Sequence, residues 1–207
     1  MEKYQITKED IKEAFLNPVR VRGMALKESL FEAIKIKAGS NAMEMIEKES
    51  NNLRYPFQVK NIKNFEWYPV GIIVEAFFVL QNKFNFQTKD FAELGEMMPK
   101  LSFMWRFLMS HLAFPEKLTK IIVTRIWRRN FDTGSVEIYD YQKSKKEGHY
   151  FLKVKDFKLH PLYFFYLGYI MVGITQMVER LKKVTVEETK SPFKGDEYQE
   201  YLIKWTK

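Results

Sequence analysis

Tyrosine recurs at every third position in a long apolar stretch, LHPLYFFYLGYIMVGITQMV, which covers residues 159–178. A tyrosine joins an apolar ring to a hydroxyl group, so a row of tyrosines can line a pocket for a hydrophobic or amphipathic molecule. The same row can also pack as an ordinary protein core. The pattern therefore predicts either a ligand-lining helix or a core helix, with Tyr163, Tyr166 and Tyr169 as the residues of interest.

The three histidines, His111, His149 and His160, are the other side chains that could bind a ligand or a metal. Their separations match no recognised zinc-ligand spacing, and the chain contains no Cys. Disulfides, thiolate catalysis and Cys-based zinc sites are therefore excluded. We assign no metal site.

A basic and aromatic cluster surrounds Trp127, with Arg125, Arg128 and Arg129 as its cations. If Arg125 and Trp127 point the same way, they could hold a carboxylate or phosphate beside an apolar ring. The formal net charge of +8 permits anionic partners. No signature of a nucleic-acid-binding fold accompanies it, so we expect no specific nucleic acid, and a solvated sheet face is the simpler interpretation.

Enzymatic signatures are absent: the chain has no P-loop, no dinucleotide-binding glycine motif, no nucleophile elbow and no HExxH. We expect no catalytic residues and no enzymatic activity. Glu75 is the most unusual acid, because it lies inside the apolar run IIVEAFFVL. A carboxylate there needs a partner, a polar cavity or a place at the helix edge facing solvent.

The bulk properties indicate one soluble, packed domain. Apolar residues make up 46% and charged residues 29% of the 207 positions. The N-terminus, MEKYQITKEDIKEAF, is charged and lacks the apolar region of a signal peptide, which predicts a cytoplasmic protein. We expect a helical extension over residues 1–20, followed by a single α+β ligand-binding-like domain over residues 21–207.

Helical periodicity dominates the first half of the chain. Thr7 with Asp10 is typical of a helix start, and Pro69 suits the first turn of a later helix. The predicted helices after the first one cover about residues 24–37, 41–48, 69–83, 88–98 and 100–113.

A period of two dominates the second half. The predicted strands cover residues 120–129, 135–141, 149–156, 184–189 and 198–205, with the tyrosine-rich helix between the third and fourth. The order is therefore β-β-β-α-β-β. Helices segregated from an antiparallel sheet indicate an α+β fold, with the sheet packed against a central helix.

The tyrosine-rich helix could also be a membrane span. Its 17 uncharged residues, 162–178, are at the lower limit for crossing a bilayer, and its tyrosines lie in the middle and not at the two ends. We therefore predict a core helix and no transmembrane segment. Gly168 and Gly173 each cost about 1 kcal/mol relative to Ala inside a helix, so close packing or a bound ligand is expected there.

The order of these elements resembles two related families. The tyrosine–glycine helix, the strand VTVEET and the turn and strand FKGDEYQEYLIKW resemble the closing part of 4-vinyl-reductase-type domains, whose fold is shared with subunits of the TRAPP tethering complex. The segments VRGMALKESLFEAIKIKAGSNAMEMI and EWYPVGIIVEAF are similar to the first part of heme nitric-oxide-binding domains. The resemblance covers about residues 21–205.

The resemblance implies a regulatory, non-enzymatic module that senses a hydrophobic or amphipathic small molecule. Its pocket would lie between helices 69–83 and 100–113 and the tyrosine-rich helix. The expected ligand-binding residues are Phe77, Phe78, Trp105, His111, Arg125, Tyr163, Tyr166 and Tyr169.

Heme is the cofactor that the resemblance raises. His111 lies on a predicted helix ahead of the sheet, where heme nitric-oxide-binding domains place their iron ligand. Those domains anchor the heme propionates with a Tyr-x-Ser-x-Arg motif, which this chain lacks. We therefore expect no cofactor, with a heme gas sensor as one alternative. A homodimeric adaptor without a ligand is the other alternative, and a homodimer is expected in either role.

Overall fold

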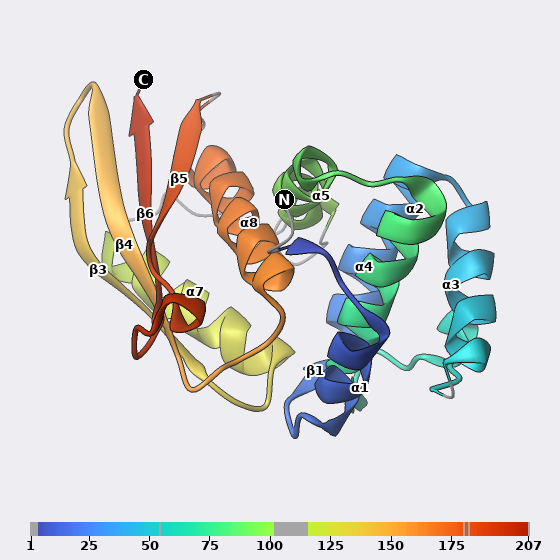
Figure 1. The fold of residues 1–207 in the computed structure, drawn as a ribbon. Coiled ribbons are helices and arrows are strands. Elements are labelled where there is room, and N and C mark those ends of the chain that lie inside the picture. The colour runs from blue at the N-terminus through green and yellow to red at the C-terminus, as the bar shows by residue number, and fades with distance from the viewer. Residues whose placement is uncertain (1–3, 54, 102–115, 180, 182, 207) are drawn as a thin grey trace.

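The computed structural model describes residues 4–53, 55–101, 116–179, 181 and 183–206, and it has the expected α+β architecture (Figure 1). The first half is helical and holds one small two-stranded sheet. Its elements are α1 (Lys8–Leu16), β1 (Arg20–Arg22), the π-helical segment η2 (Ala25–Phe31), α2 (Glu32–Ala38), α3 (Asn41–Asn52), the 3-10 turn η3 (Val59–Asn61), β2 (Trp67–Pro69), α4 (Gly71–Phe84) and α5 (Thr88–Leu101). The second half comprises α7 (Glu116–Asn130), β3 (Ser135–Lys143), β4 (Glu147–Lys155), α8 (Pro161–Glu179), β5 (Val184–Lys190), the 3-10 turn η4 (Pro192–Lys194) and β6 (Gln199–Thr206).

The main sheet has the strand order β3-β4-β6-β5, and every neighbouring pair is antiparallel. Leu152 of β4 lies opposite Ile138 of β3 and Tyr201 of β6, and all three side chains are buried. Their neighbours point to the other face, because side chains alternate along a strand. In Figure 1, α8 packs beside the inner face, and no helix of the described part of the chain covers the outer face.

The strand predicted for residues 120–129 is wrong, because helix α7 spans these residues. The order of the second half is therefore helix and then β-β-α-β-β. Val123 and Trp127 are buried four residues apart, whereas Ile121 and Arg125 are exposed. A strand would place these four side chains on one face, and only a helix separates them into a buried and an exposed pair. The alternating sequence fitted both periods, and packing of the apolar pair selected the helical one.

The helix predicted from Pro69 begins later, at Gly71. Trp67–Pro69 instead form β2, which pairs with β1 and joins Pro69 to Arg20. Gly71 is required where α4 starts, because a Cβ atom there would lie 2.5 Å from the ring of Phe15 on α1. The ring of Phe15 therefore packs directly on the backbone of the first turn of α4.

Helix α1 forms as its sequence predicts. Thr7 and Asp10 form a reciprocal capping box, in which each side chain accepts a hydrogen bond from the backbone N–H of the other. Ile6, Ile11 and Ala14 are buried in the same core as the rest of the chain. The division into a 1–20 extension and a 21–207 domain stays a prediction.

Helix α8 is the centre of the core. It is the one helix of the described part of the chain that is long and apolar enough to cross a membrane, but 67% of its most apolar window is buried inside the protein. The sheet covers one side of it and α5 covers another (Figure 1). This is the environment of a core helix.

The space beside each glycine of α8 is occupied by other protein atoms and not by a ligand. A Cβ atom on Gly173 would lie 2.4 Å from the carbonyl oxygen of Glu96 on α5. A Cβ atom on Gly95 of α5 would lie 2.7 Å from the carbonyl oxygen of Tyr166, so the two helix backbones touch at two points. At Gly168 an added Cβ atom would meet only side chains, those of Tyr201 and Val186, at 3.2 Å.

Gly173→Ala should therefore lower the free energy of unfolding by about 1–3 kcal/mol, because the new methyl group must push α5 away from α8. Gly168→Ala is the matched control. The ring of Tyr201 can move by a few tenths of an ångström, and Ala gains about 1 kcal/mol of helix propensity, so this variant should be neutral or slightly more stable. Urea unfolding measures both. Equal effects of the two substitutions would contradict the close helix contact.

Glu75 is buried on α4, with 0% of its surface exposed. Neither of its carboxylate oxygens has a hydrogen-bond partner among the described residues. Burial, with a smaller contribution from the carboxylate of Glu49, raises the pKa of Glu75 to about 8. The folded protein therefore holds this carboxyl mostly protonated at neutral pH, and the solvent-facing alternative for Glu75 is excluded.

Stability should consequently fall as the pH rises from about 5 to about 8. In this range the unfolded chain releases the Glu75 proton while the folded chain retains it, which costs up to about 1.4 kcal/mol per pH unit. Glu75→Gln removes the titration and should flatten this part of the profile. The exposed Glu44→Gln variant should keep the slope of the unmodified protein. Denaturant unfolding at several pH values gives the answer, and an unchanged slope in Glu75→Gln would contradict the assignment.

Candidate functional site

A cavity of about 80 Å³ lies between the inner face of the sheet, helices α7 and α8, and the helical first half. Its described lining is apolar except for one Asn and two tyrosine hydroxyls. The lining consists of Val21, Ala25, Leu30, Ile73, Met98, Val123, Ile126, Trp127, Asn130, Phe131, Val136, Leu152, Tyr163, Tyr166, Leu167, Ile170, Met171 and Ile174.

Aromatic rings build one wall of the cavity. Trp127 and Phe131 on α7 contact each other at a centroid distance of 4.7 Å, and both contact Phe157 edge to face, at 4.9 and 5.1 Å. Tyr163 of α8 closes the group edge to face with Phe131 at 6.3 Å. The indole N–H of Trp127 donates to the carbonyl of Thr133 at 3.2 Å, so this ring is held in place by a hydrogen bond as well as by packing.

Tyr166 forms the wall next to α5. Its hydroxyl donates to the sulfur of Met98 at 2.6 Å, and its ring packs edge to face on Phe77 at 5.1 Å. Burial raises the pKa of Tyr166 well above its usual value, and burial raises the pKa of Tyr163 as well. Both hydroxyls therefore stay protonated, and they can offer hydrogen bonds but no acid–base chemistry near neutral pH.

The structure brings together only some of the predicted ligand-binding residues. Tyr163 and Tyr166 line the cavity, and Phe77 lies directly behind Tyr166. Phe78 and Tyr169 are half-buried outside the lining, and Tyr169 packs on Phe165 instead.

Of the three remaining predicted positions, only Arg125 is described, and it does not line the cavity. Arg125 is exposed on α7, and the helix turns it away from Trp127. Trp105 and His111 lie outside the described residues, so the predicted helix 100–113 is described only as far as Leu101.

The two described histidines, His149 and His160, do not form part of a metal site. The ring of His149 lies 3.6 Å from the carboxylate of Asp140 on the outer face of the sheet. His160 precedes α8 and accepts a hydrogen bond from the backbone N–H of Leu162, and burial lowers its pKa. No group of three or more His, Cys, Asp or Glu among the described residues could hold a metal ion.

Sequence reasoning missed the contribution of α7 to the cavity. Val123, Trp127 and Phe131 recur every four residues, which is a helical signal, and all three line the cavity. The same segment also fits the two-residue period of a strand, and this pattern concealed the helical signal. Nothing in the sequence showed that the sulfur of Met98 would meet a tyrosine hydroxyl.

No protein-family model and no curated protein matches the sequence. Solved structures do match its fold. An H-NOX protein from S. oneidensis in the Fe(II)NO ligation state has a TM-score of 0.60 and 10% identity, and the match covers 90% of this chain and 99% of that one. An oxygen-binding H-NOX domain related to soluble guanylate cyclases has a TM-score of 0.60 and 11% identity, with 88% and 93% covered. An H-NOX mutant from K. algicida in its unliganded Fe(II) state has a TM-score of 0.59 and 11% identity, with 90% and 96% covered.

These similarities establish an H-NOX-like fold. They confirm the part of the sequence resemblance that concerned heme nitric-oxide-binding domains. The resemblance to 4-vinyl-reductase-type domains and TRAPP subunits stays a prediction.

The Tyr166–Met98 hydrogen bond can be tested by a double-mutant cycle. Met98→Leu keeps the volume but leaves a buried hydroxyl without its acceptor, so it should lower the free energy of unfolding by about 1–3 kcal/mol. Tyr166→Phe removes the hydroxyl itself, and adding Met98→Leu to Tyr166→Phe should then cost much less. Chemical denaturation of the four proteins measures the coupling. Strictly additive costs would show that the two side chains do not interact.

Proposed function

We propose that this chain is a non-enzymatic sensory module whose central cavity binds a small apolar or amphipathic molecule. The supporting observation is the cavity itself, which has an apolar described lining and only a few polar atoms. Apolar cavities with few polar groups are the usual form of small-molecule sites. The described lining offers no carboxylate, imidazole, ammonium or guanidinium group, which favours binding over catalysis.

The size of the cavity limits the ligand. Pockets for drug-sized molecules measure about 300–1,000 Å³, and an engineered cavity of about 150 Å³ accepts benzene. At about 80 Å³, this cavity suits a molecule of a few heavy atoms. Met98 and Met171 line it, and the flexibility of methionine allows some enlargement around a larger guest.

The described residues do not fit heme. The H-NOX structures similar to this chain include Fe(II), NO and oxygen complexes, but the cavity is several times smaller than pockets for large ligands. Its described lining has no cation to pair with a propionate, and the chain has no Tyr-x-Ser-x-Arg motif. We therefore propose a ligand much smaller than heme.

The position of the cavity supports a sensory role. Its walls come from three structural layers, with Ile73 from the helical half, Trp127 from α7 and Leu152 from the sheet. A ligand that fits one arrangement of these layers better than another shifts the population toward that arrangement. Ligand binding in the cavity can in this way change the relative positions of the layers at the outer surface of the molecule.

The competing function is a homodimeric adaptor with no ligand. Native mass spectrometry of the purified protein separates the two proposals. A small mass that co-purifies favours the sensory module, and a dimer without any additional mass favours the adaptor.

Filling the cavity should abolish ligand binding. Ala25 lines the cavity, and Ala25→Leu adds three carbons to it. Cyclopropane, an apolar molecule of three carbons, at about ten times its dissociation constant should raise the melting temperature of the unmodified protein by roughly 3–6 °C, because it binds the folded state alone. Ala25→Leu should show no shift. The control is Ala92→Leu on α5, outside the lining, and it should respond like the unmodified protein. Equal shifts in all three proteins would place the cyclopropane site elsewhere.

Hemin titration tests the exclusion of heme directly. Added hemin should give only the absorbance spectrum of free hemin, with no shifted Soret band. A stoichiometric Soret shift that is lost in His111→Ala would overturn the exclusion and make the chain a heme protein.

A further inference from the structure

The outer face of the sheet carries an apolar row that no described helix covers. Tyr139 of β3 lies opposite Phe151 of β4, and Phe151 lies opposite Leu202 of β6. All three side chains are half-buried, and the rings of Tyr139 and Phe151 stack at a centroid distance of 5.3 Å with 18° between their planes. The row is therefore a rigid, partly exposed apolar strip across three strands.

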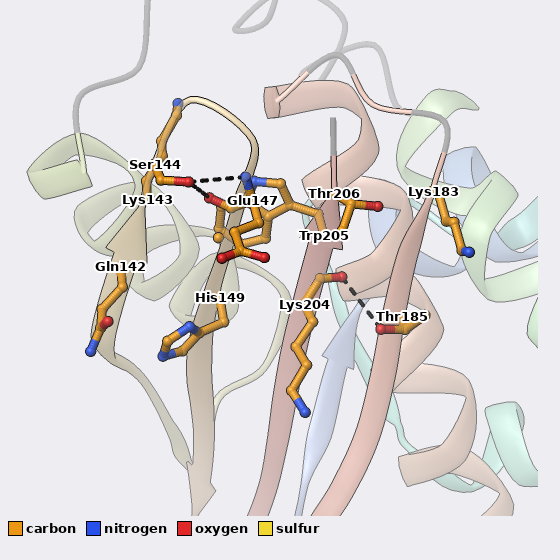
Figure 2. Close-up of a pocket in the computed structure, with 11 residues that line it drawn as sticks. Gln142, Lys143, Ser144, Glu147, His149, Lys183, Thr185, Lys204, Trp205 and Thr206 are labelled. Atoms are coloured by element: carbon orange, nitrogen blue, oxygen red, sulfur yellow. Dashed lines mark hydrogen bonds between the residues drawn. The ribbon is translucent and has the colours of Figure 1, made fainter.

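A polar, cation-bearing row follows toward the β3–β4 hairpin. Gln142, His149, Lys204 and Thr185 are cross-strand neighbours in that order, one from each strand. They line an open cleft of about 610 Å³, and Lys143 and Lys183 are part of its wall (Figure 2). Figure 2 shows the amino groups of Lys183 and Lys204 at separate places along the cleft, so they do not converge on one small anion.

The lysines of the cleft are only partly neutralised. Lys143 pairs at 2.6 Å with Glu179, a nearly buried carboxylate at the end of α8, and Lys204 lies 3.6 Å from the exposed Glu187. Lys183 has no acidic partner in the described part of the chain, and the same holds for Lys145 and Lys146 of the hairpin loop.

We propose that this face docks an acidic segment of a partner protein. An apolar side chain of the segment rests on the row Tyr139–Phe151–Leu202, and its carboxylates lie over the lysines of the cleft. On β4 and β6 the two rows are two residues apart, or about 6.6–6.8 Å, and on β3 a bulge between Tyr139 and Gln142 adds one residue. An extended peptide repeats its same-face side chains at the same interval, so an apolar residue followed two positions later by Glu or Asp matches the surface.

The rim of the cleft favours a peptide over a nucleic acid. Glu147 and Glu187 stand beside the lysines, and Asp140 stands beside His149. These acids repel a phosphate backbone, which carries a charge at every nucleotide. A peptide can place its carboxylates opposite the lysines and leave neutral residues opposite the acids.

The docking face is independent of the cavity. The cavity opens on the inner face of the sheet, where Val136 and Leu152 point, and the docking face is the outer one. Failure of the docking proposal leaves the proposed cavity function unaffected, and the reverse also holds.

Fluorescence anisotropy tests the proposal with a labelled peptide in which one Phe precedes three Glu residues at alternate positions. The first variant, Lys183→Glu with Lys204→Glu, reverses two charges of the cleft. The matched control, Lys48→Glu with Lys60→Glu, reverses two exposed lysines elsewhere, and both variants lower the net charge from +8 to +4, two units for each reversal. The cleft variant should bind the peptide at least about 10-fold more weakly, and the control within about 3-fold of the unmodified protein.

Two further arms complete the test. Leu202→Ser removes part of the apolar row and should also weaken binding several-fold, with near-ultraviolet circular dichroism verifying the fold of each variant. If the charge-reversal variant does not fold, the neutral variant Lys183→Gln with Lys204→Gln replaces it in the binding assay. Equal weakening in the cleft and control variants would reduce the effect to net charge and overturn the proposal. Tighter binding of an oligothymidylate of equal charge than of the peptide would also overturn it.

Discussion

Helix α8 has no charged side chain before Glu179, so it must be covered on most of its sides, and the rest of the molecule is arranged to do this. The sheet covers one side through the inward side chains of β4 and β6. Helix α5 covers another, and it reaches backbone contact because Gly95 and Gly173 lack side chains. The short helix-to-helix distance therefore follows from two residues, and it fixes the place of α5 relative to the sheet.

The cavity follows from the same arrangement. Where α5 and α8 touch, no space is left. On another side of the same stretch of α8, the large rings of Tyr163, Trp127 and Phe131 do not interdigitate as closely as backbone and glycine do. Helix α7 supplies two of these rings and closes the space from a third direction. The result is the small apolar cavity. The H-NOX structures with a similar fold include an Fe(II)NO state and an oxygen complex.

Much of this fold was predictable from the sequence, because hydrophobic periodicity marks α8, the strands β3 to β6 and most helices. The α7 segment was not, since Val123 and Trp127 satisfy a period of two with Arg125 and a helical period with Phe131. Only the tertiary contacts of Trp127 decide between them. The site was half predictable: the tyrosine spacing identified Tyr163 and Tyr166, but the pairing of the Tyr166 hydroxyl with the Met98 sulfur joins residues 68 positions apart. The sequence left open whether Glu75 is buried or faces solvent, because the position of Glu49 on α3 beside it is set by helix packing and not by local sequence.

The proposed function requires the cavity to be an accessible apolar site. Diffraction from crystals pressurised with xenon measures this directly, because xenon enters apolar cavities and scatters strongly. We predict a xenon atom between Tyr163, Tyr166 and Ile170, with no displacement of α5. Crystals that take up xenon only at surface sites, with this cavity empty, would contradict the proposed binding site.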